Sequence, residues 1–493
     1  MPTTPSPPAD STKAPRAAAP AVRPARRSGL IALLMRLHFY AGVLVAPFLV
    51  AAALTGLLYT LAPQIDRVLY ADALWVAQPG DRAVPLSEQV AAAQTFETGL
   101  DVASVRVSDD PDRTTTVTFS DPALTDDRER SVYVDPYTGE VTGELVTWFG
   151  STPAVTALDD LHRNLLLGDL GRHYSEIAAS WLWVIALGGL VLWLRRRRTS
   201  SRIRRTVVPD LSVTGRRRTL SWHGATGVWL LVGLLFLSMT GLTWSRFAGE
   251  RFSTLLTSLD ATNPGVQTVI EGVGDPTAGS HAGHGGAAAV ALDVDQLEVV
   301  VAAAMSAGVD APYVMTPAGP GSAWTVAEDD DRWPVQQDEM AVDPRTGEII
   351  DINPWSERSG LSKLSTLGVA AHMGLLFGPV NQLLLAALAV GLLCVIFWGY
   401  RTWWQRRPRR GGARVGRAPR RGAWRGVHPA ALAVVLCAAV AVGWVLPWFG
   451  WSLLGFLAVD AAIGVRQARR HDSSSQADSE EPRDPADDGA LLV

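Results

Sequence analysis

The stretch that decides the fold lies in the first apolar run and reads His38-Phe-Tyr-Ala-Gly42, with Thr55-Gly56 further along. A later apolar run repeats the pattern as His223-Gly-Ala-Thr-Gly227, followed by Thr240-Gly241. In both copies the glycine follows the histidine by 4 positions and the threonine follows it by 17. Agreement at several fixed spacings predicts one structural unit used twice.

Two further landmarks recur in the same order. His162-Arg-Asn-Leu-Leu-Leu-Gly168 and His372-Met-Gly-Leu-Leu-Phe-Gly378 each stand before an apolar run. The polar segments between the runs share Val134-Asp-Pro-Tyr-Thr-Gly-Glu140 and Val342-Asp-Pro-Arg-Thr-Gly-Glu348. These repeats predict an internal duplication in which each unit consists of a helix, an outer domain and a second helix.

The offset between the copies grows along the chain, from 185 positions at the first histidines to 208 at the Val-Asp-Pro segments. The second outer domain therefore contains an insert, which we place in the Gly/Ala-rich stretch around 261–290. His281 and His284 in this stretch could form a two-histidine metal clip, but a flexible loop is the interpretation that we favour.

Composition indicates a chain divided between lipid and water. Hydrophobic residues make up 48% of the 493 positions, and mean hydropathy is +0.14. The apolar residues gather in runs that approach the roughly 20 residues needed to cross a bilayer. The two cysteines, Cys394 and Cys437, lie inside such runs, which excludes a disulfide framework in the outer domains. The predicted spans are 30–62, 174–194, 219–245, 376–400, 428–447 and 448–466.

Arginine clusters predict the orientation, because short cytoplasmic loops carry an excess of positive charge. Arg23, Arg26 and Arg27 precede the first span, and the loops 195–218 and 401–427 are rich in arginine. We therefore expect an inner-membrane protein with both termini cytoplasmic and the segments after the first and third spans outside. The predicted order is a disordered cytoplasmic tail (1–29), first span (30–62), first outer domain (63–153), outer-face helix and second span (154–194), basic loop (195–218), third span (219–245), second outer domain with the insert (246–360), outer-face helix and fourth span (361–400), basic loop (401–427), C-terminal helix hairpin (428–466) and acidic disordered tail (467–493).

Each outer domain has the pattern of a small α+β module. Leu86–Gln94 and Val294–Met305 have helical periodicity, and alternating runs typical of strands follow them. The Asp-Pro-x-Thr-Gly segments predict turns between strands, because proline fixes φ and glycine accepts a strained conformation. We expect one helix on a small antiparallel sheet in each domain.

These motifs, in this order over residues 30–405, resemble the PepSY-associated transmembrane helix proteins. The resemblance implies an α-helical polytopic membrane protein with a four-helix core and two PepSY-like extracytoplasmic domains. That family includes iron-regulated membrane proteins and haem-containing ferric-siderophore reductases. The C-terminal hairpin and both tails lie outside the resemblance.

Four matched histidines are the candidate cofactor ligands. Histidine is rare at membrane depth, so His38 and His223 near the inner side, and His162 and His372 near the outer face, indicate a functional site. Related halves would place them as two pairs, His38 with His223 and His162 with His372. Axial histidines in an apolar bundle suit haem iron, so we expect two b-type haems. A structural role, in which each ring only bonds a neighbouring helix, is the alternative for any one histidine.

Residues near the histidines are compatible with more than one role. Gly42 and Gly227 could admit a flat macrocycle or serve as helix contacts, and Arg36 and Arg163 could pair with haem propionates. Zinc or copper is the competing ligand class, but no Cys or Glu stands in a matched position beside the histidines. His173 has no partner in the other copy and is a spare candidate.

The expected function is a transmembrane electron conduit. A cytoplasmic donor or quinol would reduce the inner haem, and the outer haem would reduce a ferric, siderophore-type substrate that the resemblance implies. We predict no nucleic-acid partner, and the sequence pattern marks no residue as catalytic. One alternative is a haem-free regulator whose outer domains bind a peptidase or peptide. A metal permease is a weaker alternative, since Asp460 is the acidic residue that we place in the spans, outside the duplicated core.

Overall fold

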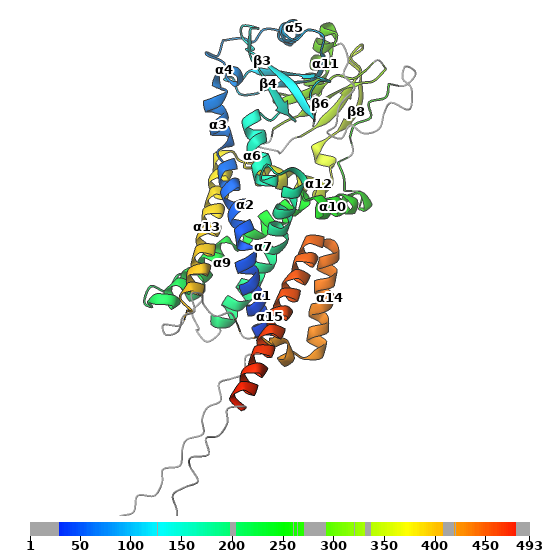
Figure 1. Ribbon diagram of the computed structural model, residues 1–493. Coiled ribbons are helices and arrows are strands. Elements are labelled where there is room, and N and C mark those ends of the chain that lie inside the picture. The colour runs from blue at the N-terminus through cyan, green and yellow to red at the C-terminus, as the bar shows by residue number, and fades with distance from the viewer. Residues whose placement is uncertain are drawn as a thin grey trace, which may run out of the picture.

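The computed structural model describes residues 29–125, 127–197, 204–259, 261–263, 265–270, 292–319, 321–330, 337–407, 419 and 421–479. A β-sheet domain stands above a helical region (Figure 1). The expectations for residues 1–28, for His281 and His284, and for residues 480–493 concern positions outside the described residues.

Long apolar helices form the helical region and make this a membrane protein. Four described helices are long and apolar enough to cross a bilayer, and the bent pair α1–α2 makes a fifth if it is one span. The bounds are α1 Gly29–Leu44, α2 Ala46–Tyr59, α7 Gly168–Arg197, α9 Gly215–Thr243, α13 Pro379–Trp404, α14 Pro429–Val445 and α15 Pro447–Ser479.

The predicted first span is two helices rather than one straight helix. α1 and α2 meet at Val45 with a bend of 54°. Pro47 causes the bend, because proline has no N–H to bond the carbonyl one turn earlier. The hydroxyl of Tyr400 on α13 donates to that carbonyl, of Val43, at 2.9 Å. An unpaired backbone group in lipid is thereby avoided.

The C-terminal hairpin contacts the core through α15. Trp181 on α7 donates its indole N–H to the hydroxyl of Ser452 at 2.8 Å, and Arg36 on α1 forms an ion pair with Asp460. The expected disordered tail from 467 was wrong in its first part, because α15 continues to Ser479. No proline or glycine interrupts the segment between Arg466 and Ser479, so helix can propagate there.

Eight antiparallel strands form one sheet, in the order β4-β3-β2-β1-β5-β6-β7-β8. The prediction of two separate small sheets was therefore wrong. β1 pairs with β5, Val105 lying opposite Met315, so two edges that would otherwise expose unpaired backbone groups bond to each other. The strands are β1 Asp101–Val107, β2 Thr115–Ser120, β3 Arg128–Val134, β4 Val141–Trp148, β5 Tyr313–Thr316, β6 Trp324–Glu328, β7 Glu339–Val342 and β8 Ile349–Asn353.

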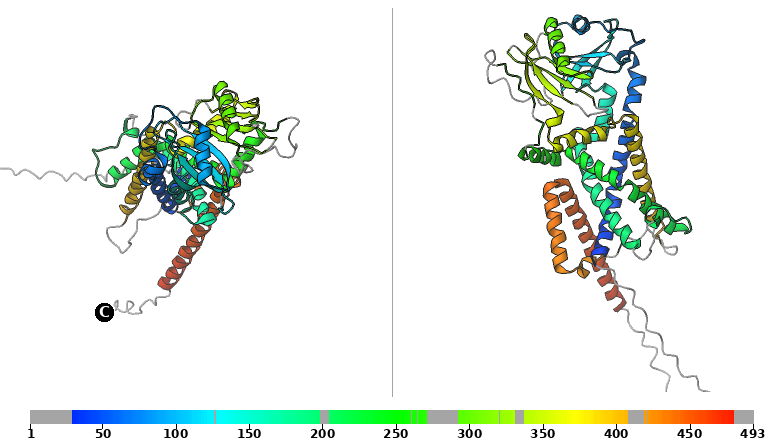
Figure 2. Two further views of the ribbon diagram at one scale, coloured as in Figure 1. Left: turned by 90° about the horizontal axis from the view of Figure 1, so that it is seen from above. Right: turned by 180° about the vertical axis from the view of Figure 1, so that it is seen from behind.

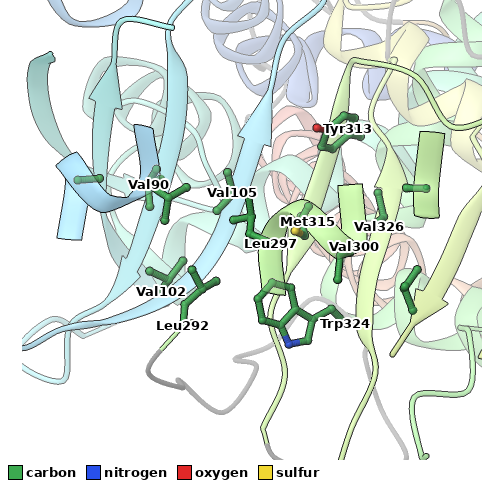
Figure 3. Close-up of a cluster of buried hydrophobic side chains, with 14 of the residues drawn as sticks. Val90, Val102, Val105, Leu292, Leu297, Val300, Tyr313, Met315, Trp324 and Val326 are labelled. Carbon is green, nitrogen blue, oxygen red and sulfur yellow. The ribbon is translucent and has the colours of Figure 1, made fainter. Parts of the chain in front are cut away.

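One hydrophobic core serves both halves of the sheet. The predicted helices are α5 Leu86–Phe96 and α11 Val294–Ser306, and both pack on the same face. Val90 and Leu297 from these helices are fully buried against Val105 and Met315 from the joining strands (Figure 3). Burial of such side chains contributes about 1.5–3 kcal/mol each, so the shared core holds the halves together.

The two predicted Asp-Pro turns have the same geometry. The carboxylate of Asp135 accepts the backbone N–H of Tyr137 at 2.8 Å, and Gly139 has φ +70°. Asp343 accepts from Arg345 at 2.9 Å, and Gly347 has φ +73°. Each glycine occupies the left-handed conformation that the sequence led us to expect.

Shorter helices connect the sheet to the spans. α6 and α12 lie between the sheet and the long helices (Figure 1). The bounds are α3 Ala62–Leu69, α4 Ala71–Leu74, α6 Pro153–Asn164, α8 Arg204–Val207, α10 Arg246–Ser258, α12 Gly360–Met373 and the 3-10 turns η1 Trp355–Glu357 and η2 Ala423–Gly426.

Candidate functional site

The structure brings His38 on α1 and His223 on α9 together as a sheet-distal pair. Their ring centroids are 6.3 Å apart, with an interplanar angle of 74°. Nδ1 of His38 bonds the carbonyl of Ile185 at 3.0 Å, and Nδ1 of His223 bonds the carbonyl of Val395 at 2.9 Å. A carbonyl can only accept, so Nδ1 carries the hydrogen and Nε2 is left with its lone pair.

His162 on α6 and His372 on α12 form a sheet-proximal pair. Their ring centroids are 6.4 Å apart, with an interplanar angle of 49°. Nδ1 of His162 lies 2.9 Å from the hydroxyl of Thr55, and Nδ1 of His372 lies 2.6 Å from that of Thr240. Each hydroxyl donates its hydrogen to its own helix, and therefore accepts from the imidazole. Nε2 is again the free ring nitrogen.

These contacts occur at constant sequence offsets. His223 and Thr240 lie 185 positions after His38 and Thr55, respectively. His372 lies 210 positions after His162, and the two carbonyl acceptors, Ile185 and Val395, show the same offset of 210. Each histidine contact in the first half of the chain thus has a counterpart in the second half.

A glycine on a neighbouring helix lies behind each ring. A Cβ added to Gly189 would stand 2.9 Å from Cε1 of His38, and one on Gly399 would stand 3.5 Å from Cε1 of His223. The corresponding distances are 3.1 Å from Gly56 to His162 and 3.9 Å from Gly241 to His372. Sequence reasoning had noted Gly56 and Gly241 only as repeat markers. It missed Gly189 and Gly399, although their offset of 210 could have identified them.

Gly42 and Gly227 face open space. A Cβ built on either would meet nothing within 4 Å. Neither glycine therefore makes the close helix contact that was the alternative to admitting a macrocycle.

The two pairs lie at different depths. Along α9, 17 residues separate His223 from Thr240, the partner of His372. At 1.5 Å per residue this is about 25 Å of helix. The pairs therefore form two separate sites within the bundle.

The two arginines suggested for propionates have acidic partners instead. Arg36 is 8% exposed and forms an ion pair with Asp460, to which Arg421 also lies at 3.3 Å. Arg163 contacts Asp159 and Asp160 on its own helix and lies over the ring of Trp148. The positive charge of each arginine is thus already balanced by a neighbouring carboxylate.

His173, the spare candidate, is not close to either pair. Its ring lies 4.7 Å from that of Trp448 on α15, and its Nδ1 has no hydrogen-bond partner. One turn further along α7 stands Glu176, which is 1% exposed. The interpretation that Asp460 is the acidic residue of the spans was therefore wrong, since Glu176 lies inside the predicted span 174–194.

Paired imidazoles with fixed tautomers can ligate a metal from both sides through Nε2. Among the described residues, no three His, Cys, Asp or Glu side chains gather as a metal site. A metal held at either pair would thus have two His, Cys, Asp or Glu ligands among the described residues.

Comparison with curated proteins finds no match. The family described as "PepSY-associated TM region" matches residues 35–406, which contain all four paired histidines and both Asp-Pro turns. The C-terminal hairpin α14–α15 lies beyond the matched region. Because the match spans about three quarters of the sequence, the chain belongs to the PepSY-associated TM family.

Proposed function

We propose that this protein is a di-haem electron-transfer protein that carries electrons through the membrane to reduce a ferric, siderophore-type substrate outside. The observation that carries the proposal is the pairing of His38 with His223 and His162 with His372 at ring distances of 6.3 and 6.4 Å. The sheet-distal histidines sit on the apolar helices α1 and α9 and the sheet-proximal ones on the connecting helices α6 and α12, with every Nδ1 engaged and every Nε2 available.

The spacing within each pair fits a metal held between two imidazoles. Ring centroids 6.3 and 6.4 Å apart leave room between the two imidazoles for one metal atom bonded to a nitrogen of each at about 2.0–2.1 Å. Two histidines complete the coordination of haem iron, because the porphyrin supplies four nitrogens of its own. A zinc ion would need two further protein ligands.

The surroundings favour a flat apolar cofactor over a bare ion. Gly42 and Gly227 each lie one helical turn from a histidine of the sheet-distal pair, and open space faces both. A bundle core is a common place for a haem. The bound haem would supply one-electron chemistry by cycling between ferric and ferrous iron.

The protein's own residues orient the ligands and exclude water. The carbonyls of Ile185 and Val395 and the hydroxyls of Thr55 and Thr240 fix the ring tautomers. Such outer partners also raise the basicity of the ligating nitrogen. The apolar helices around the rings keep the sites dry, which influences the reduction potential.

The proposal also includes the internal duplication and the orientation of the chain in the membrane. The matched offsets of 185 and 210 support an origin of both halves from one unit. The arginine-rich segments support placing the sheet domain, with two PepSY-like halves, outside the inner membrane and both termini in the cytoplasm. The sheet-proximal pair would then deliver electrons outward. The donor would be a cytoplasmic protein or a quinol.

The test is an oxidised-minus-reduced absorption spectrum of the full chain, purified from cells supplied with haem. We expect b-type bands and two haems per chain by pyridine haemochrome assay. A folded sample that lacks haem bands overturns the proposal and leaves the haem-free PepSY regulator as the better hypothesis.

A further inference from the structure

A buried polar cluster lies apart from both histidine pairs, where α7, α10 and the start of α15 meet. Its members are His173 and Glu176 on α7, and Trp448 on α15. Nδ1 of His173 and Nε1 of Trp448 are buried and have no hydrogen-bond partner, and Glu176 beside them is 1% exposed. Buried polar atoms without partners are rare in folded proteins, so two at one junction need an explanation.

The cluster combines acceptors, a donor and an aromatic wall. His173 and Glu176 are three positions apart on one helix, so their side chains are neighbours. The indole of Trp448 lies with its ring centroid 4.7 Å from that of the imidazole, tilted by 45°, and offers an N–H. The backbone N–H groups of Phe247 and Ala248, in the first turn of α10, face the carboxylate of Glu176.

An apolar groove of about 550 Å³ lies between α7, α9 and α14. Figure 2 shows the hairpin α14–α15 standing beside α7 and α9, with its turn toward the sheet domain. Leu446, which lines the groove, is two residues from Trp448 and belongs to the same hydrophobic cluster as Ala248. Met239 and Val445 also line the groove and are 59% and 51% exposed, so the groove reaches the lipid-facing surface.

We propose that this junction binds an isoprenoid quinol, with its tail in the groove and its hydroxyls on Glu176 and His173. A quinol has hydroxyl donors, an aromatic ring and an apolar chain, and the junction provides acceptors and aromatic rings, with an apolar groove nearby. A phospholipid matches less well, because its phosphate would meet the carboxylate of Glu176. An ionisable residue buried in a membrane span is in itself an indication of function.

This inference rests on the proposed function for its electron acceptor. Oxidation of one quinol to the quinone breaks two O–H bonds and releases two protons and two electrons. Glu176 takes one proton on its carboxylate, and His173 takes the other at Nδ1. The two electrons would go to ferric haem held by the histidine pairs, whose one-electron chemistry would connect a two-electron donor to a one-electron ferric acceptor.

The site lies close to the sheet-proximal pair. Trp244 contacts His372, with 5.4 Å between ring centroids, and it stands three residues before Phe247. His173 is only half-buried and lies one turn nearer the sheet-side end of α7 than Glu176, so protons can leave toward water.

The experiment is anaerobic calorimetric titration of the full chain, in lipid nanodiscs, with decylubiquinol. We expect one site per chain and about ten-fold weaker binding in Glu176→Gln, because a charge-assisted hydrogen bond is roughly twice as strong as a neutral one. Met239→Trp, which fills the groove, should weaken binding at least as much. Ala439→Trp is the matched control, since Ala439 lies on the same helix but lines a neighbouring apolar groove of about 330 Å³ and not this one. That variant should bind like the wild type.

The outcomes separate this site from the haem proposal, because binding heat does not depend on haem. Haem bands without quinol binding overturn the quinol site alone, and binding without haem bands overturns the electron-transfer proposal alone. If Glu176→Gln fails to fold, Met239→Trp decides. Unchanged affinity in Met239→Trp, or equal weakening in Ala439→Trp, overturns the site. A phospholipid retained in mass spectra and not displaced by decylubiquinol also overturns it.

Discussion

The two histidine pairs have nearly equal ring spacing, 6.3 and 6.4 Å, but different supports. In the sheet-distal pair each Nδ1–H donates to a backbone carbonyl, of Ile185 or Val395. In the sheet-proximal pair each donates to a threonine hydroxyl, of Thr55 or Thr240. No side-chain substitution removes a backbone carbonyl, whereas one substitution removes a hydroxyl. We therefore predict that replacing the acceptor of the Nδ1–H bond can weaken haem binding only at the sheet-proximal site, where that acceptor is a side chain.

The largest effect should come from removing a ligand. His38→Ala or His223→Ala should abolish haem binding at the sheet-distal site and leave the other, because about 25 Å of helix separates them. His162→Ala or His372→Ala should do the reverse. Haem stoichiometry falls from two to one in each case, measured by pyridine haemochrome assay. Loss of both haems from a single change would contradict the assignment of two independent sites. His173→Ala is the control and should keep both haems.

The next largest effect should come from removing a threonine hydroxyl that accepts the Nδ1–H hydrogen bond in the sheet-proximal pair. Thr240→Val leaves Nδ1 of His372 without its acceptor and should weaken haem binding at the sheet-proximal site about 10–100-fold. Thr55→Val should act likewise through His162. Titration of haem into the apo protein measures the affinity of each site.

Serine provides the matched control for these threonine variants. Thr240→Ser and Thr55→Ser retain the hydroxyl, so affinity should stay near that of the wild type. Valine variants that bind haem as tightly as the serine variants would show that the hydroxyls have no effect on the ligands.

Whether the sequence predicts the acceptors of the Nδ1–H bonds depends on their chemistry. It identifies the two threonines, because Thr55 and Thr240 repeat at the same offset of 185 positions as His38 and His223. It does not identify the carbonyls of Ile185 and Val395, because every residue has a carbonyl and only the packing of α7 and α13 selects these two. Glu176 can also be read in the sequence, as an acidic residue inside the predicted span 174–194. The bend at Pro47 could have been foreseen, since proline inside a helical run breaks the backbone ladder.

The sheet shows the same limit at a larger scale. Alternating runs and the Asp-Pro-x-Thr-Gly turns predict the helices and strands of each half. They do not predict that β1 pairs with β5, because the local sequence pattern of a strand does not specify which other strand it pairs with. The sequence period specifies which face is buried, and the joining of the two halves is set by long-range packing around Val105 and Met315.

A third prediction uses the glycines behind the rings. Gly189→Ala puts a Cβ 2.9 Å from Cε1 of His38, whereas Gly399→Ala puts one 3.5 Å from Cε1 of His223. The tighter contact must move the ring, and such overpacking costs about 1–3 kcal/mol. We expect Gly189→Ala to alter the low-temperature electron paramagnetic resonance spectrum of the sheet-distal haem and Gly399→Ala to leave it nearly unchanged. At the sheet-proximal pair, Gly56→Ala should likewise change the spectrum more than Gly241→Ala does. Equal effects within a pair would contradict the steric explanation.

The smallest expected effect is that of replacing Gly42 or Gly227 by alanine. Whether the change stabilises the apo protein or weakens haem binding shows what occupies the open space beside these glycines. In a helix, replacing glycine by alanine stabilises by roughly 0.8–1.0 kcal/mol when the new methyl group meets no obstacle. Nothing lies within 4 Å of a Cβ at either position, so both variants should raise the thermal midpoint of the apo protein slightly. If a macrocycle occupies the open space, the same variants should lower haem affinity at the sheet-distal site. Gly455→Ala on α15 is the matched control, because its Cβ is equally unobstructed but far from the histidines in the sequence. It should raise the midpoint of the apo and haem-loaded forms alike, so a drop in haem affinity confined to Gly42→Ala and Gly227→Ala identifies the face on which the cofactor lies.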